Sequence, residues 1–277
     1  MSASAQKIRR YLVAGVQLTS REDVAENLAR CEALVREAAA RGASLVALPE
    51  NFSFFGDEAK KLASAEPLDG PVLTRLASLA AELHIHIVAG GFPERASVPG
   101  KVHNTLVVFG PRGERLAVYR KIHLFDVDLP GAGQRYRESD TVVPGDETVV
   151  VDTELGKLGL SICYDVRFPE LYRQLAEKGA ELILVPAAFT QYTGKDHWHA
   201  LLRARAIENQ AYVLAPGQFG QHNPKRATYG KSVLIDPWGL VVAQAGDREG
   251  VVIGEVDFAE LDRVRAELPA LRHRRLP

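Results

Sequence analysis

The stretch GLSICYDVRFPE, residues 159–170, decides the fold class. Its first half is short and apolar, as in a buried strand, and it runs into polar residues from Tyr164 onward that form a turn. Pro169 suits the first turn of a helix that follows. This order predicts an α/β fold in which the thiol of Cys163 lies at the carboxyl end of a strand and near the start of a helix.

Two interpretations of Cys163 follow from the local pattern. Helix-terminal N–H groups would favour a thiolate and later an oxyanion, as a nucleophile requires. Alternatively, Cys163 is a small buried apolar residue, which is the common fate of cysteine. The other cysteine, Cys31, lies in a predicted helix without an obvious base, so packing is the favoured interpretation there.

On either side of this stretch, predicted helices and strands alternate, but hairpins also occur. Strands are expected at 11–18, 44–48, 85–91, 104–109, 115–119, 148–152, 157–162, 182–185, 212–215 and 251–256. Helices are expected from Thr19 or Ser20 to Gly42, and at 72–83, 170–178, 196–209 and 258–268. The mixture predicts mixed rather than purely parallel sheets, in one domain that spans residues 1–277.

The composition excludes several classes of function. The chain has 277 residues, 46% of them hydrophobic, and a net charge of -1, so a sizeable core is expected and no overall field points to nucleic acid or a membrane. Neither a CxxC pair nor an HExxH motif occurs, which argues against a zinc site. Two cysteines, an N-terminus without a signal-like apolar stretch and no apolar run near the ~20 residues of a membrane span favour a soluble, cytoplasmic protein.

Two further polar residues follow predicted strands. Glu50 comes directly after Ala47-Leu48-Pro49, where partial desolvation would raise its pKa toward the range of a general base, although a solvated loop or cap glutamate fits as well. Lys121 follows the hairpin strand that ends at Arg120, and could be a solvated edge charge or point inward toward Glu50 and Cys163. An inward ammonium would stabilise an oxyanion.

Three segments carry a resemblance to a known family. They are Leu48-Pro49-Glu50-Asn51, then residues 119–124 with Lys121, then residues 162–171 with Cys163. Their residues and their order resemble the signature segments of the nitrilase superfamily, the carbon–nitrogen hydrolases. The resemblance extends from Gln17 past the turn at 236–239.

The resemblance implies a fold and an activity. The implied fold is a four-layer αββα sandwich whose subunits pair through helices, giving a homodimer or a higher homo-oligomer with the tail from about residue 258 at the interface. The implied activity is hydrolysis of nitriles, amides or carbamoyl groups of small molecules, without metal or organic cofactor. A non-enzymatic scaffold on the same fold is the alternative that intact Glu50, Lys121 and Cys163 argue against.

The same resemblance implies roles for individual residues. Cys163 is the nucleophile and Glu50 the general base, while Lys121 and the backbone N–H of Tyr164 stabilise the tetrahedral intermediate. Many members of the family have a further glutamate, and Glu138 is the best match here, with a surface loop acid as its alternative.

Other segments narrow the substrate. Residues 197–208 resemble Nit-type amidases, and residues 225–232 resemble the branch that acts on deaminated glutathione, although Lys231 replaces the histidine of many members. An ω-amidase acting on α-ketoglutaramate, or a carbamoylase, remains the alternative.

Residues of a substrate pocket are expected near the nucleophile. Arg167 would hold a substrate carboxylate, or else pair with Glu170 or Asp165. Thr193 matches a position that contacts substrate in similar amidases. The aromatic rings of Phe189 and Trp198 would line the pocket or belong to the core, and Arg203 and Arg205 are expected to be structural, with Glu208 within reach of Arg205.

Overall fold

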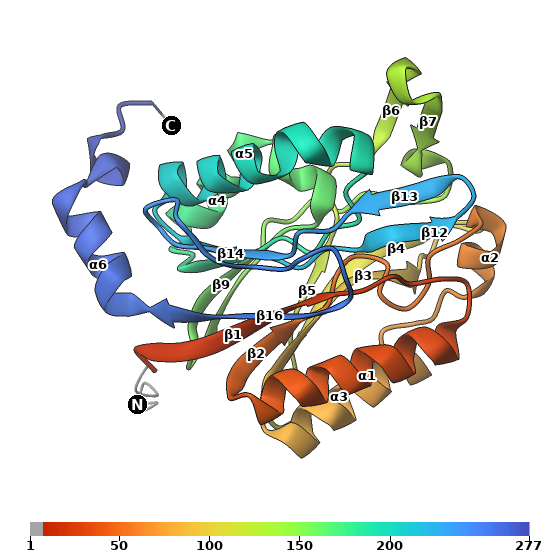
Figure 1. Cartoon of the computed structure of the whole chain (residues 1–277), viewed down its shortest axis with the longest axis horizontal. Helices are drawn as coiled ribbons and strands as arrows, with labels where there is room; N and C mark the ends of the chain where they lie inside the picture. Colours follow the sequence, from red (N-terminus) through yellow and green to blue (C-terminus); the bar gives the residue numbers. More distant parts are fainter. Residues whose placement is uncertain (1–7, 277) are drawn as a thin grey trace.

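The computed structural model describes residues 8–276. Two six-stranded sheets pack face to face, and helices cover the outer side of each sheet (Figure 1). The layers therefore run helix, sheet, sheet, helix. This is the αββα sandwich that the family resemblance implies, and its sheets are mixed, as the sequence pattern predicts.

The first sheet contains the N-terminal half of the chain and one late strand. Its order is β16 (Gly250–Asp257), β1 (Arg10–Gln17), β2 (Ala43–Ala47), β3 (His86–Arg95), β4 (Val102–Phe109) and β5 (Arg115–Arg120). β1, β2 and β3 are parallel, and the remaining pairs are antiparallel. Its outer face is covered by α1 (Val24–Ala40) and α3 (Pro71–Leu83) (Figure 1).

The start of α1 corrects a prediction from the sequence. The helix begins after Asp23, whose carboxylate accepts the backbone N–H of Glu26, and not at Thr19 or Ser20. Thr19 and Ser20 instead hydrogen-bond across to Phe219 and Gln218. An aspartate cap competes well with serine or threonine, so the sequence offered several candidate starts.

The second sheet contains the strand that leads to Cys163. Its order is β15 (Val241–Gln244), β14 (Val233–Ile235), β11 (Tyr212–Ala215), β10 (Leu182–Leu184), β9 (Gly156–Leu160) and β8 (Val150–Thr153). Its outer face is covered by α4 (Pro169–Glu177) and α5 (Gln191–Asn209) (Figure 1). α5 begins five residues earlier than predicted because the side chain of Thr190 caps it.

Side chains of the first sheet alternate between two cores, because successive residues of a strand point to opposite faces. Val13, Leu45 and Val88 lie between the two sheets. Val46 and Ile87 lie beneath α1 and α3. The residues that follow β2, β5 and β9 therefore emerge at the rim of a tightly packed double sheet.

Several small elements were not predicted from the sequence. They are the hairpin of β6 (Asp126–Leu129) and β7 (Gln134–Arg137), the hairpin of β12 (Phe219–Asn223) and β13 (Arg226–Tyr229), and α2 (Glu58–Ala63). Short 3₁₀ turns occur at Pro130–Ala132, Glu138–Asp140, Cys163–Arg167 and Ala270–His273, and α6 (Phe258–Glu267) follows β16. No helix within residues 8–276 is long and apolar enough to cross a membrane.

Candidate active site

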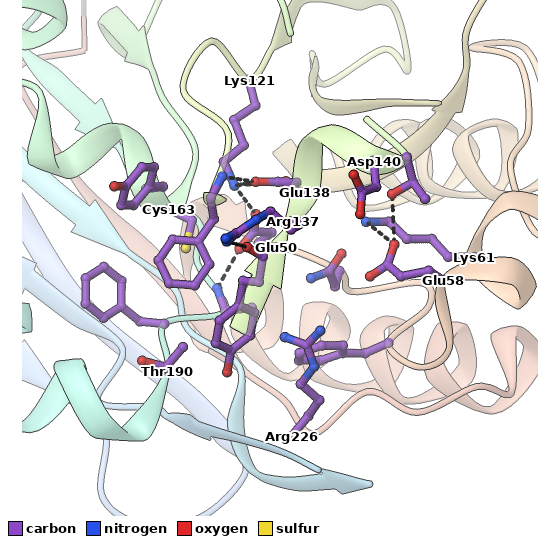
Figure 2. Close-up of a pocket in the computed structure, with 18 of the residues that line it drawn as sticks. Glu50, Glu58, Lys61, Lys121, Arg137, Glu138, Asp140, Cys163, Thr190 and Arg226 are labelled. Carbon is purple, nitrogen blue, oxygen red and sulfur yellow. Dashed lines mark hydrogen bonds and ion pairs between the residues drawn. The ribbon is translucent and has the colours of Figure 1, made fainter. Parts of the chain in front are cut away.

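Four side chains from distant parts of the sequence converge at one cavity (Figure 2). Glu50 follows β2, Lys121 follows β5, Cys163 follows β9, and Glu138 follows β7. The cavity has a volume of ≈ 720 Å³ and all four residues line it. The three strand-end residues singled out in the sequence therefore meet, as does the additional glutamate.

Lys121 joins the two carboxylates. Its ammonium Nζ lies 3.1 Å from Glu50 Oε1 and 2.8 Å from Glu138 Oε2, with Glu138 Oε1 at 3.1 Å. The lysine is only 2% exposed, so it is not the solvated edge charge that the sequence also allowed. A buried cation held by two anions is fixed in position and aimed into the cavity.

The charges in this cluster stabilise one another. Burial by itself lowers the pKa of Lys121, but the carboxylates of Glu138 and Glu50 outweigh it and raise that pKa well above its usual range. Burial by itself raises the pKa of Glu138, but the positive charges of Lys121 and Lys61 outweigh burial and lower that pKa overall. Both groups therefore stay ionised at neutral pH.

Glu50 is held by donors on two sides. Its Oε2 accepts a hydrogen bond of 2.8 Å from the backbone N–H of Ala188, and its Oε1 accepts one of 2.8 Å from the amide Nδ2 of Asn104. Asn104 also donates to Glu138, at 3.1 Å. The carboxylate is thus pre-oriented, and being 4% exposed it is neither a cap nor a solvated loop residue.

Cys163 occupies an unusual backbone conformation. Its φ of +47° lies in the left-handed region that residues with a Cβ seldom adopt, and its N–H donates to Pro186 O at 2.9 Å. Burial, and next the negative charge of Glu50, raise the pKa of the thiol well above its usual value, while Lys121 acts in the opposite sense. A thiol in this environment is protonated at rest, so it needs a neighbouring base to react.

The turn that carries Cys163 is fixed by a buried carboxylate, Asp165. It accepts hydrogen bonds from the Tyr119 hydroxyl at 2.6 Å, from the Ile162 N–H at 2.9 Å and from the His123 N–H at 3.1 Å. The ring of His123 stacks on Phe168, with 3.7 Å between the centroids. Asp165 therefore ties the loop of Lys121 to the loop of the nucleophile.

Replacing Asp165 with alanine is expected to destabilise the protein by about 3 kcal/mol, because three donors lose a fully buried acceptor. Thermal and urea unfolding measure the change. Asp262→Ala is the control, since its ion pair with Arg9 lies at the exposed surface, where water screens it and little stability depends on it. Equal destabilisation by both substitutions would contradict the role given to Asp165.

The predicted pocket residues are brought together with one exception. Tyr164, Arg167, Phe189 and Thr193 line the cavity. Trp198 does not: it is fully buried behind Phe189, with 5.1 Å between their ring centroids, and its indole N–H donates to Lys231 O. Its large apolar ring is a core residue that supports the cavity wall.

The guanidinium of Arg167 has no carboxylate partner in the part of the chain that the structure describes, so the pairing with Glu170 or Asp165 is absent there. It lies 3.3 Å from His197 Nδ1 and 5.1 Å from the centre of the Phe189 ring. A cation beside an aromatic wall and free of an anion suits a substrate carboxylate.

The remaining candidates are structural. Arg205 pairs with Glu208 at 2.6 Å and donates to Val166 O, while Arg203 donates to Gly239 O. Cys31 is fully buried, which raises its pKa to about 12. Within residues 8–276, no group of three His, Cys, Asp or Glu side chains is arranged to hold a metal ion.

Other residues at the site were not identified from the sequence. Asn104 begins a predicted strand, and its only signal was a polar side chain at the start of an apolar run. Phe125, Tyr136 and Arg226 also line the cavity. The latter two come from the two unpredicted hairpins, where four-residue strands give little periodicity to read.

Comparison with known proteins extends these observations. A model of the carbon–nitrogen hydrolase family matches residues 12–266. A deaminated glutathione amidase of Synechocystis sp. is 49% identical over 267 residues, which cover 95% of this chain and 98% of that protein. An omega-amidase NIT2 of Xenopus tropicalis is 42% identical over 250 residues, which cover 90% of each.

Solved structures show the same similarity in three dimensions. The crystal structure of the C. elegans NitFhit protein superposes with a TM-score of 0.92 at 40% identity. The superposition covers 98% of this chain, which spans 66% of that longer one. Both sheets and the converging loops therefore lie within the shared region.

Proposed function

The chain belongs to the carbon–nitrogen hydrolase family and is an amidase, and we propose that Cys163, Glu50 and Lys121 carry out its reaction through a thioester intermediate. The observation that carries the proposal is the hydrogen-bonded contact of Lys121 with Glu50 in the cavity that Cys163 also lines. A base, a cation and a thiol are the three groups that such a reaction needs.

In the first half of the reaction, Cys163 Sγ attacks the amide carbon and its proton passes to Glu50. The negative charge that develops on the carbonyl oxygen is stabilised by Lys121 Nζ and the N–H of Tyr164. The C–N bond then breaks, Glu50 gives the proton to the departing nitrogen, and a thioester with Cys163 remains. The amine or ammonia leaves the cavity.

In the second half, Glu50 takes a proton from a water molecule, which attacks the thioester carbon. The same two donors stabilise the second oxyanion. The C–S bond breaks, the sulfur regains its proton from Glu50, and the carboxylate product leaves. Glu138 acts through Lys121, since its carboxylate holds the same ammonium that Glu50 contacts, and is therefore a positioning residue.

We propose deaminated glutathione as the substrate. Two features support it: the 49% identical relative with that activity in its name, and Arg167, which is free to hold a carboxylate near the nucleophile. Thr193 and Phe189 would contact the same half of the substrate. The ω-amidase alternative is supported by the 42% identical relative.

The substrate proposal predicts a ranking of activities. The wild-type protein should release 2-oxoglutarate from deaminated glutathione with a kcat/KM at least about tenfold higher than from α-ketoglutaramate, a difference of about 1.4 kcal/mol in transition-state binding. An enzyme-coupled assay of 2-oxoglutarate measures both, and an N-carbamoyl amino acid completes the panel. The reverse order would make the protein an ω-amidase, and preferred carbamoyl hydrolysis would make it a carbamoylase.

The raised pKa of Cys163 predicts the alkaline side of the pH profile. The reactive pair is a Glu50 carboxylate beside a protonated thiol, so activity falls at high pH when this pair loses the thiol proton. Since burial and Glu50 raise the thiol pKa, kcat/KM should stay level past about pH 9, beyond the ordinary titration of cysteine. A decline centred near pH 8.5, measured in overlapping buffers, would contradict this.

We infer that the protein forms a homodimer through the turn at 236–239 and its neighbours. Trp238, Leu240, Val241 and Val242 are each more than 40% exposed, and Ile207 of α5 lies against Gly239. A contiguous exposed apolar patch of this kind is typical of a protein–protein interface. The C-terminal helix α6 borders it, since Arg263 lies 5.8 Å from the Trp238 ring.

Replacing Val241 with glutamate is expected to shift the protein from dimer to monomer, because an unpaired carboxylate would be buried in the interface. Sedimentation velocity or light scattering measures the mass. Val98→Glu is the control, because Val98 is 45% exposed but lies on a distant loop. A wild-type monomer, or a dimer that tolerates Val241→Glu, would contradict the inference.

We further propose one functional domain over the whole chain and a cytoplasmic location. Both cysteines are free thiols, and a catalytic thiol works only while it is reduced. The cytoplasm keeps thiols in that state. Fractionation of cells with an antibody against the protein tests the location.

A further inference from the structure

The cationic side chains that line the cavity fall into two groups. The first group consists of cations that already form an ion pair. Lys61 pairs with Glu58, and Lys121 pairs with Glu50 and Glu138. Arg135 and Arg137 both pair with Asp128. Arg167 and Arg226 form none with any carboxylate of residues 8–276. Arg167 lies near the nucleophile, and the mechanism already uses it.

Arg226 is therefore the cation that the mechanism leaves without a role. It begins β13, it is half-buried, and its guanidinium lies 4.2 Å from the centre of the Tyr136 ring. Within the described part of the chain, that guanidinium donates no hydrogen bond to a protein group. Figure 2 shows it pointing into the cavity, apart from the cluster of Cys163, Glu50 and Lys121.

The contact with the Tyr136 ring positions the guanidinium of Arg226. The aromatic face fixes the plane of the guanidinium, while its N–H groups stay free along the edge. A planar fork of donors matches a carboxylate through two hydrogen bonds. The ring and the arginine come from two hairpins, β6–β7 and β12–β13, that meet at this side of the cavity.

We propose that Arg226 binds a second carboxylate at the end of the substrate that leaves with the amine. This inference rests on the proposed function and names its substrate class: an N-substituted amide with one carboxylate on the acyl half, near Arg167, and another on the amine half. Deaminated glutathione, in which the amino group of glutathione is replaced by a keto oxygen, has this form. α-Ketoglutaramate lacks the second carboxylate.

The size of the cavity agrees with an extended substrate. Its ≈ 720 Å³ lies within the range of about 300–1,000 Å³ of pockets that enclose drug-sized ligands, whereas a small primary amide would leave much of it to water. The distal arginine then supplies binding energy far from the reacting bond. Such energy acts equally on the bound substrate and the transition state, so it appears mainly in KM.

The test uses deaminated glutathione and the same molecule with its glycine carboxylate converted to a carboxamide. Arg226→Gln should lower kcat/KM for the natural diacid about 10- to 100-fold, mostly through KM, because a charged hydrogen bond is lost. With the carboxamide, Arg226→Gln and wild type should differ by less than about threefold, since that substrate has no carboxylate for the arginine to bind.

Lys225→Gln is the matched control. It removes the same charge from the neighbouring position of the same hairpin, but Lys225 is exposed and outside the cavity, so activity with the diacid should be retained. Equal losses of activity in both variants would mean that the positive charge acts on the substrate at long range and not through a direct contact. That result would overturn the inference.

Two further outcomes separate the inference from the proposed function. If wild type hydrolyses deaminated glutathione but Arg226→Gln leaves its KM unchanged, or raises KM equally for both substrates, the inference is wrong and the proposed function stands. If wild type hydrolyses α-ketoglutaramate but not deaminated glutathione, the proposed substrate is wrong and the inference falls with it.

Discussion

Cys163→Ala is expected to lower kcat by about 10⁴-fold or more, because the variant has no atom that can form the covalent intermediate. The fold should remain, since the side chain loses only its sulfur. The assay is release of 2-oxoglutarate from deaminated glutathione, with circular dichroism to confirm folding. Binding should survive as well, because Arg167 and the other cavity walls are unchanged.

Cys31→Ala is the control for this substitution. Cys31 is fully buried in α1 and does not line the cavity, so its loss should reduce stability by about 1 kcal/mol while kcat stays within a few-fold of wild type. Substantial activity in Cys163→Ala, or inactivity of Cys31→Ala at full folding, would refute Cys163 as the nucleophile.

Glu50→Gln is expected to lower kcat by about 10²–10⁴-fold, because the amide keeps the shape of the carboxylate but cannot accept or return a proton. It should also change the thiol. The charge of Glu50 raises the pKa of Cys163, so its removal, with Lys121 still present, should lower that pKa. The pH profile of iodoacetamide alkylation at Cys163 should therefore shift to lower pH.

Glu94→Gln is the control for Glu50→Gln. Glu94 is also a buried carboxylate next to a basic side chain, with Arg120 at 2.6 Å, but it does not line the cavity. Its substitution should lower the melting temperature and leave the alkylation profile of Cys163 in place. A Glu50→Gln variant that keeps near-normal kcat, or alkylates with the wild-type pH profile, would contradict the role of the base.

The meeting of Glu50, Lys121 and Cys163 was predictable because each follows a strand whose end could be read from the sequence. Strands of a sandwich end at a rim, so polar residues directly after them are constrained to a small region. The resemblance of the three segments to one family then indicated that the strand ends of the two sheets lie together. No local sequence pattern contains that information. Glu138 was found only through that resemblance, because nothing in Arg137-Glu138-Ser139 marks an inward direction.

The parts that were missed share a physical cause. Asn104 and Tyr136 are positioned by tertiary contacts: Asn104 by the two carboxylates that it bridges, Tyr136 by the cation stacked on it. The sequence allows Trp198 to line the pocket or to belong to the core, although an aromatic residue of this kind is more often in the core. Its complete burial behind Phe189 decides for the core.

The most direct test of the central claim is mass spectrometry of the wild-type protein after rapid acid quench during turnover. Deaminated glutathione and α-ketoglutaramate have the same acyl half, so both should add the same 2-oxoglutaryl mass to the peptide that contains Cys163, and none to the peptide of Cys31. Product formation with Cys163 unmodified, or adducts whose mass depends on the leaving group, would contradict the account.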